Sequence, residues 1–507
     1  MQSLSVVPNL CRLTPLIALV VCIAGCRTGG PPDARYRQLS QDIALVASQP
    51  PGSISVASPR LDHLAAERTI EELIVAGLRQ NTEIQEAQLM VESLANRVPQ
   101  VASLPDPLLA ATVFPSPVQT AAGQQEFALG LNQKVPWRGK LDTRAAMAQQ
   151  DVIAARARLA AVELKVVQQI RNACFQLYFV QQALQIINED RSRRELMVRV
   201  INQTYQVNPD ISQQDLLQIE VALKEVDTEI LQLEQQQISA RARLARLLHV
   251  SPDTPFAIRS LPPQQTVNRV QELYETAIQC RPELHAQLAE IGRDRRASSL
   301  AELQNRPDMT WGFNWIGTSS AGISPVANGD DAFMLTLGMN LPVYRKRIDA
   351  GVREARTRAL ASARKYERLR DETLESVADL FARIESLQAT RQLFVDEIIP
   401  KQELTFNQSV ADYQVNKVDF QQMVGNWQKL LRYRIEDKQL QARIHQTLAS
   451  LSRQIGQFDL EEQDHLIFSN IPDAKQPLPE PVQPQTLADE PPPLVAPADS
   501  HPGKRIP

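Results

Sequence analysis

The feature that most constrains this chain is a segment that occurs twice, about 200 residues apart. Residues 126–142 read EFALGLNQKVPWRGKLD, and residues 332–349 read AFMLTLGMNLPVYRKRID. In each copy apolar residues alternate with small or polar ones up to a proline, and helical spacing follows a basic cluster. The change of period from 2 to 3.6 predicts a strand that leads into a helix. We therefore expect two copies of one larger unit.

Each copy is followed by the pattern of a long helical hairpin. Residues 141–205 contain no proline and no glycine, and apolar residues recur there at helical spacing. At 1.5 Å per residue such a helix would be roughly 100 Å long. A break at residues 207–210 and a second helical pattern over 211–248 predict an antiparallel pair. The second copy repeats this plan up to residue 455, with an interruption near Pro400.

A shorter helix and a strand–loop–strand segment precede each hairpin. The sequences AGLRQNTEIQEA and TAIQCRPELHAQ stand 200 residues apart, with Glu83 matching Glu283, and they extend the duplication towards the N-terminus. The expected helices are 69–101 and 267–305. The expected strands are 108–114, 126–135, 309–315 and 333–341, with loops at 115–125 and 316–331.

Four short strands in one chain cannot close a membrane barrel, which needs at least about 8 strands. Open strand edges are not tolerated in lipid, so chains would have to associate, and three chains would supply twelve strands. Phe127, Leu129 and Leu131 alternate with small or polar residues, which fits a barrel with an apolar exterior. A soluble sandwich with these faces as its core is the alternative.

The N-terminus has the pattern of an export signal. Residues 13–25 form a short apolar run behind Arg12, too short to span a bilayer as a helix. The run ends in Ile-Ala-Gly-Cys, which resembles a bacterial lipobox and implies cleavage before Cys26 and lipid on Cys26. Arg27 follows the cysteine, and by the same resemblance this favours the outer membrane. The alternative is an ordinary secretory signal whose cysteine is accidental.

Composition argues against several other classes. The net charge of -4 gives no electrostatic footprint for nucleic acid. Beyond the signal, no run of about 18 apolar residues predicts a transmembrane helix. The six histidines are scattered without metal-ligand spacing, and no phosphate loop or nucleophile elbow occurs. Cys174 and Cys280 are expected to be small core residues. We expect no catalytic site, no cofactor and no metal site.

The duplicated strand–loop–strand and helical hairpin resemble the TolC-like outer-membrane efflux protein family over residues 66–457. The segment KVPWRGKL, residues 134–141, is similar to the branch that works with metal- or drug-exporting pumps of the resistance-nodulation-division type. The resemblance implies a mainly α fold with a small β part. It implies a homotrimer with a twelve-stranded β-barrel in the outer membrane, continued by a helical tunnel through the periplasm. The implied partners are a periplasmic adaptor, an inner-membrane pump and outer-membrane lipid.

The expected organisation of the chain follows from these patterns. It comprises a signal peptide (1–25), a tether (26–65), a first repeat (66–256), a second repeat (257–457) and a proline-rich, disordered tail (458–507).

The resemblance also assigns roles to residues at the two ends of the long helices. Pro136 and Pro342 would turn the chain from barrel to helix, and the hairpin tips would form a periplasmic entrance where the adaptor docks. The entrance residues are Tyr205, Asn208, Asp210, Asp215, Tyr413, Asn416, Asp419 and Gln422. Tyr413 matches a family tyrosine that helps to hold the entrance shut. The family often has an aspartate where this chain has Gln422, so the chain departs here from the family's acidic, cation-binding ring. Plain turn and cap residues are the alternative.

A basic cluster lies at the expected membrane boundary. It consists of Arg138, Lys140, Arg345, Lys346 and Arg347. These side chains would either reach lipid head groups or form a solvated collar.

The function expected from the whole pattern is a passive exit duct for small molecules or metal ions, with most of the chain in the periplasm. The alternative is a lipid-anchored periplasmic coiled-coil adaptor or scaffold. Adaptors carry one hairpin rather than two strand–loop–strand and hairpin units, so the duplication favours the duct.

Overall fold

The computed structural model describes residues 69–205, 213–263, 269–320, 329–414 and 417–458, and the following account concerns these ranges. The chain divides into two units, Met1–Pro59 and Arg60–Pro507, and every described residue belongs to the second. Within the described ranges, no helix combines the length and the apolar content needed to cross a lipid bilayer.

The helix expected over 69–101 is in fact two helices, α3 (Ile70–Gln80) and α4 (Thr82–Ala102). The break lies at Asn81, whose side-chain oxygen accepts from the backbone N–H groups of Glu83 and Ile84 and so caps α4. The same break occurs 200 residues later between α7 (Val270–Cys280) and α8 (Pro282–Leu303). There Pro282 at the first turn starts the new helix. Each predicted single helix was therefore wrong in the same way.

Four antiparallel strands form one sheet in the order β1-β2-β3-β4. Their bounds are β1 (Leu108–Thr120), β2 (Gly123–Val135), β3 (Met309–Thr318) and β4 (Ala332–Met339). The expected loop at 115–125 is wrong, because both strands of the first pair run to a short turn at residues 121–122. Pro115 and Pro117 lie in β1 at a shift of register between Val113 and Val118. An edge strand accepts such prolines because one row of its N–H groups has no ladder partner.

The strand register confirms the predicted alternation of faces. Leu109 pairs with Leu131, Leu131 with Phe313, and Phe313 with Leu335, so one face carries an apolar row across all four strands. The row on the opposite face consists of Ala110, Gly130, Asn314 and Met334. The apolar row is exposed in the single chain, and the side chain of Leu335 is 85% accessible.

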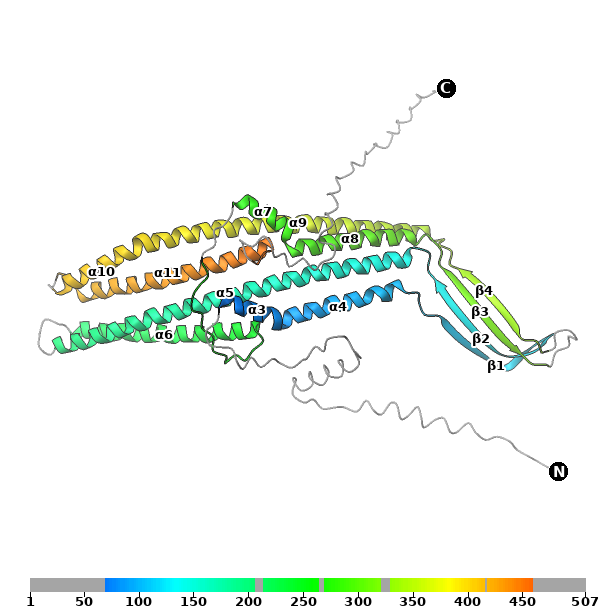
Figure 1. The fold of residues 1–507 in the computed structure, drawn as a ribbon, viewed down its shortest axis with the longest axis horizontal. Helices are drawn as coiled ribbons and strands as arrows, with labels where there is room; N and C mark the ends of the chain where they lie inside the picture. The colour runs from blue at the N-terminus through cyan, green and yellow to red at the C-terminus, as the bar shows by residue number, and fades with distance from the viewer. Residues whose placement is uncertain (1–68, 206–212, 264–268, 321–328, 415–416, 459–507) are drawn as a thin grey trace, which may run out of the picture. The chain divides into compact units, whose positions relative to one another are not determined.

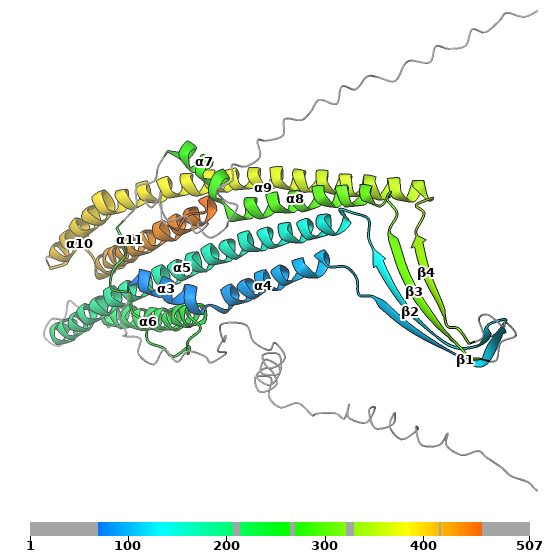
Figure 2. The same ribbon diagram turned by 45° about the vertical axis from the view of Figure 1, so that its right-hand side comes forward.

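The first hairpin consists of α5 (Lys140–Tyr205) and α6 (Gln213–Leu247), as expected. Helix α5 packs against α4, α6, α8 and α11, and Figures 1 and 2 both show it among these helices. This position explains why apolar residues on several faces of α5 are buried, and these residues join two core clusters. Val166, Ile170 and Leu177 belong to one cluster, and Val180 and Ile187 to the other.

The second hairpin consists of α9 (Arg345–Leu393), a π-helical turn η1 (Phe394–Ile398), α10 (Ile399–Gln414) and α11 (Phe420–Ile455). The interruption predicted near Pro400 is this turn, in which the N–H of Ile399 donates to the carbonyl of Phe394. A π turn closes one residue more than an α turn. Counted from the matched lysines, the second copy has two residues more between Lys346 and Tyr413 than the first has between Lys140 and Tyr205. We infer that the turn accommodates one of these extra residues.

Candidate functional site

The strand-to-helix junction of the first copy is built around a buried lysine. Pro136, which is buried, and Gly139, which has a φ of +88°, lie between β2 and α5. Lys140 is the first residue of α5, and its side chain is 1% exposed. Its Nζ donates to the backbone oxygen of Arg306 at 3.0 Å and to Oδ1 of Asp308 at 2.8 Å. Lys140 therefore joins the start of α5 to the residue before β3.

The burial of Lys140 differs from both expectations for the basic cluster. A lysine that reached head groups or lay in a solvated collar would be exposed, whereas this ammonium is enclosed with an anionic partner. Burial of this kind is tolerated because the charge is both paired and hydrogen-bonded. The other members of the cluster, Arg138, Arg345, Lys346 and Arg347, are exposed, as expected.

Asp308 is the anionic centre of the junction. Its Oδ1 also accepts from the backbone N–H of Trp137 at 3.0 Å, and its Oδ2 lies 3.8 Å from Nζ of Lys134. Burial acts to raise the pKa of Asp308, but the hydrogen bonds from Lys140 and Trp137 outweigh it and lower the pKa below its ordinary value. The guanidinium of Arg306 lies over the Trp137 ring, 6.0 Å from its centroid.

The junction of the second copy is open by comparison. Pro342 is half-buried between β4 and α9, and the side chains around it are exposed. Leu341 is 68%, Val343 64% and Tyr344 73% accessible. The two prolines therefore occupy equivalent places in the chain but different surroundings.

At the opposite end of the long helices, the structure describes only part of the expected entrance. Asn208, Asp210 and Asn416 lie outside the described residues. Tyr205 ends α5 and Asp215 lies in the first turn of α6, so both belong to the first tip by backbone position.

Three expected entrance residues are brought together at the second tip. The ring of Tyr413 meets that of Phe420 edge-on at 5.7 Å between centroids. Asp419 caps α11, and its Oδ1 accepts from the backbone N–H of Gln422 at 2.7 Å. Phe420 and Met423 are buried and pack against Tyr413 and Val410. The cap geometry of Asp419 fits the plain structural alternative, while Tyr413 ties α10 to α11.

A buried polar cluster that the sequence analysis missed joins the two hairpins. Asp190 and Arg194 on α5 are 5% and 3% exposed, and Arg194 Nε lies 2.7 Å from Asp190 Oδ2. The indole N–H of Trp427 on α11 donates to Asp190 Oδ1, and Arg194 lies over the indole at 5.2 Å from its centroid. Arg194 also donates to the carbonyl of Ala222 on α6. Three helices thus share one ion pair.

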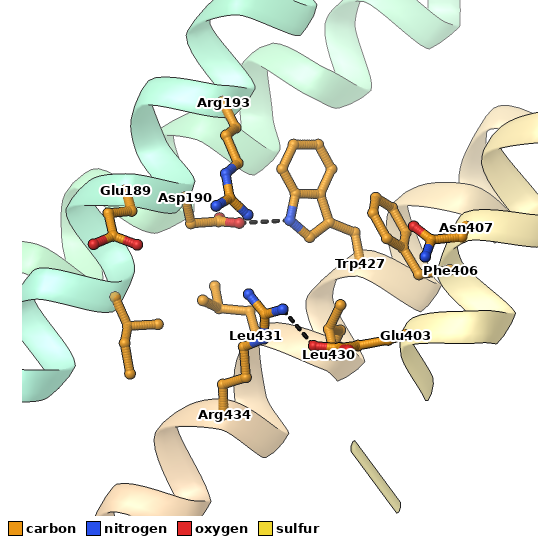
Figure 3. A pocket seen from close by; sticks show the side chains of 11 residues that line it. Glu189, Asp190, Arg193, Glu403, Phe406, Asn407, Trp427, Leu430, Leu431 and Arg434 are labelled. Atoms are coloured by element: carbon orange, nitrogen blue, oxygen red, sulfur yellow. Dashed lines mark hydrogen bonds and ion pairs between the residues drawn. The ribbon is translucent and has the colours of Figure 1, made fainter. Parts of the chain in front are cut away.

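A pocket of about 520 Å³ opens beside this cluster, between α5, α10 and α11. Figure 3 shows Asp190 facing the indole of Trp427 on one side and Arg434 facing Glu403 on another. The remaining lining is mixed, with Phe406, Leu430 and Leu431 beside Glu189 and Arg193. A sequence signal existed, because Asp190 and Arg194 stand at i and i+4 next to the buried stripe residue Ile187.

The described residues contain no group of three or more His, Cys, Asp or Glu side chains that could hold a metal ion. Cys174 is buried, and burial raises the pKa of its thiol to about 12, so this thiol stays protonated. The expected core role of Cys174 agrees with this position.

No protein-family model matches the chain, and no curated protein matches it. Solved structures do match. The outer-membrane channel OprN is 16% identical, with a TM-score of 0.66, over 76% of this chain and 89% of that chain. The outer membrane protein VceC from Vibrio cholerae is 19% identical, with a TM-score of 0.64, over 77% of this chain and 97% of that chain.

A third similar structure is the CmeC outer membrane channel of Campylobacter jejuni. It is 12% identical, with a TM-score of 0.63, over 80% of this chain and 89% of that chain. At such identities the likeness concerns the fold, and at that level it confirms the family resemblance expected from the sequence.

Proposed function

From the fold of the TolC-like outer-membrane channels, which the described chain has, we propose that this protein is the exit duct of a tripartite efflux system. It would pass small molecules or metal ions delivered by an inner-membrane pump through a periplasmic adaptor. The observation that carries this proposal is the match to known channels over about nine-tenths or more of their own length. The duct performs no chemistry, since the pump supplies the energy and the duct supplies a path and a gate.

The proposed assembly is a homotrimer with a twelve-stranded barrel. Each sheet has two open edges, β1 and β4, and an apolar face that is exposed in the single chain. An apolar outer face and a face of small or polar residues are what a barrel in lipid requires. Closing three sheets into one ring pairs every edge and leaves no unpaired backbone in the lipid. Pro136 and Pro342 would then mark the change from barrel to periplasmic tunnel.

The proposed gate lies at the hairpin tips, with Tyr413 holding α10 against α11. The Asp190–Arg194–Trp427 cluster supports this arrangement, because it fixes the first hairpin to the second about 22 Å along α5 from Tyr205 and about 10 Å along α11 from Phe420. An adaptor that realigns the helices would have to act against these contacts. The expected entrance residues Tyr205, Asn208, Asp210, Asp215, Asn416, Asp419 and Gln422 would surround the opening.

The proposed location is the outer membrane, with lipid on Cys26 after removal of residues 1–25. Most of the chain would lie in the periplasm. The repeats 66–256 and 257–457 would form the duct, with the tether before them and the proline-rich tail after them. Loss of palmitate labelling in a Cys26→Ala variant, with export retained, would support the lipid anchor.

The test of the duct is conductance of the purified full-length chain in planar bilayers. We expect a detergent-extracted trimer that gives small conductance steps, and we expect Tyr413→Ala to open it more often because the tip contact is lost. Val395→Ala, at an exposed position in η1, is the control and should leave conductance unchanged. A monomer that stays in the aqueous fraction and never conducts would contradict the duct and favour the scaffold alternative.

A further inference from the structure

The duplication places the two halves of a second junction at opposite edges of the sheet. Pro342 and Lys346 in the second copy match Pro136 and Lys140 in the first, both 206 residues apart. The Pro-Asp pair at 307–308 before β3 is matched by the Pro-Asp pair at 105–106 before β1. Lys140 and Asp308 flank the inner strands β2 and β3, whereas Lys346 and Asp106 flank the edge strands β4 and β1.

The two outer groups are complementary but separate in the single chain. Asp106 and Lys346 are both exposed, and neither side chain has a hydrogen-bonded or ionic partner among the residues that the structure describes. Neighbouring strands lie about 4.8 Å apart, so the two edges are roughly 14 Å apart across the sheet. This separation exceeds the reach of a lysine side chain. Lys346 therefore cannot repeat, within its own chain, the contact that Lys140 makes.

The residues beside these charges are complementary as well. In the inner junction Arg306 stacks on Trp137. The corresponding outer positions hold Leu104 and Val343, which are 49% and 64% accessible. Two apolar side chains thus take the places of the stacked cation and ring, and burial of their surfaces against one another would be favourable. An apolar pair and an opposite-charge pair occur at matched places on both edges.

We propose that the β4 edge of one chain meets the β1 edge of a second copy, so that Lys346 binds the partner's Asp106 and Val343 packs on the partner's Leu104. This contact between chains would have the same form as the junction that Lys140 and Asp308 make within one chain. The proposal rests on the proposed trimeric duct, and it assigns the residues that hold its subunits together at the membrane boundary. A head-to-tail contact of this kind repeats around a ring and closes it.

The first experiment is zero-length carbodiimide cross-linking of the full-length trimer, which joins a carboxylate to an amine only when they are in contact. We expect an intermolecular peptide pair that links Lys346 to the partner's Asp106, identified by mass spectrometry. The link should be lost in Asp106→Lys and in Lys346→Asp, and should return in the double variant, in which the charges are exchanged. The control is Arg353→Asp, which also reverses an exposed positive charge on α9 but lies outside the proposed contact.

The second measurement is the temperature at which the trimer separates on a detergent gel. Each single reversal should lower this temperature, and the double variant should recover most of the loss. A trimer that survives both reversals unchanged and gives no Lys346–Asp106 link would overturn the assigned seam while leaving the duct intact. The absence of any trimer in the unaltered protein would instead contradict the proposed function itself.

Discussion

The two copies of the repeat share one plan but differ in what surrounds them. In the first copy, the junction lysine is buried and α5 lies among five other helices, α3, α4, α6, α8 and α11. In the second copy, the matched lysine is exposed, and the buried residues of α9 are only Ile348, Thr373, Val377 and Ile384 among those described. The same sequence pattern therefore becomes an interior element in one place and a boundary element in the other. Burial depends on the neighbours as much as on the pattern.

The comparison also explains why the second copy has so much uncovered apolar surface. Large exposed apolar residues cluster on β4 and on residues 341–344, which lead into α9, and β1 of the first copy shows the same exposure. Contiguous surface of this kind marks an interaction site rather than a random distribution. The uncovered apolar surface is therefore greatest at the two edge strands, β1 and β4, and these edges are where a partner or lipid would contact the chain.

The largest expected effect tests the two junction lysines directly. Lys140→Met keeps the length of the side chain but leaves Asp308 without its closest cation, so we expect a loss of about 3 kcal/mol in the free energy of unfolding. The matched variant Lys346→Met should change the stability of the chain itself by less than about 0.5 kcal/mol. Urea unfolding in detergent, followed by circular dichroism, measures both. Equal losses of unfolding free energy in the two variants would show that the burial of Lys140 does not make its contacts more stabilising than those of the exposed Lys346.

A smaller loss of stability is expected at the Asp190–Trp427 hydrogen bond, where the helical hairpins of the two copies contact one another. Trp427→Phe keeps an aromatic ring but removes the N–H that donates to Asp190, which should cost about 2 kcal/mol because a charged acceptor loses a buried donor. Tyr433→Phe, in the same helix and outside this cluster, is the control. The same unfolding assay applies, and bilayer conductance should show more frequent opening. An unchanged midpoint would indicate that the cluster does not join the hairpins energetically.

The smallest effect concerns pH and a position where the copies differ. His445 on α11 is buried against Phe175, and its counterpart in α6 is Gln237. Burial, together with the charge of Arg391, lowers the pKa of His445 to about 4 from the ordinary 6.5. The unfolded chain therefore binds this proton first as the pH falls from about 6.5 to about 4. Stability decreases across that window and shows no further loss from this group below it.

His445→Gln gives the second copy the residue of the first and should remove this part of the acid sensitivity. The expected difference between the unaltered chain and the variant is slightly less than about 2 kcal/mol between pH 7 and pH 5, from pKa values of 6.5 and about 4. Unfolding at the two pH values measures it, with His249→Asn as the control, because this histidine is exposed and asparagine also tolerates its φ of +53°. Identical pH profiles for His445→Gln and the unaltered protein would contradict the buried, neutral state of this imidazole.

Much of the fold could be predicted from the sequence because its main signals are periodic. The repeat, the strand faces, the long helices and the breaks between them all follow from spacing that local physics enforces. The helix breaks at Asn81 and Arg281 were missed because the apolar pattern continues across them, while the cap of Asn81 and the N1 position of Pro282 end each helix locally. The strands through Pro115 were missed because an edge position tolerates proline.

The candidate site was harder to predict, because its key residues depend on contacts between distant segments. Lys140 sits in a basic cluster that indicates exposure, and only the arrival of Asp308 makes its burial possible. Asp190 and Arg194 stand at i and i+4 in one hairpin, but no local pattern joins them to Trp427 in the other hairpin. Tyr413 could be predicted from the resemblance, since its place at the tip is set by the matching Tyr-Gln-Val-Asn turns.

The buried Lys140 also determines when its junction can fold during synthesis of the chain. Its acceptor Asp308 is 168 residues further along the chain, so a growing polypeptide carries an unpaired ammonium at this place until the second strand pair has been synthesised. Contacts of such long sequence separation are slow to form, because the entropy cost of closing a large loop comes before the contact stabilises the fold. The first repeat by itself would therefore lack the partner of Lys140 at its strand-to-helix junction. That junction is complete only once the chain has been made as far as the residue before β3.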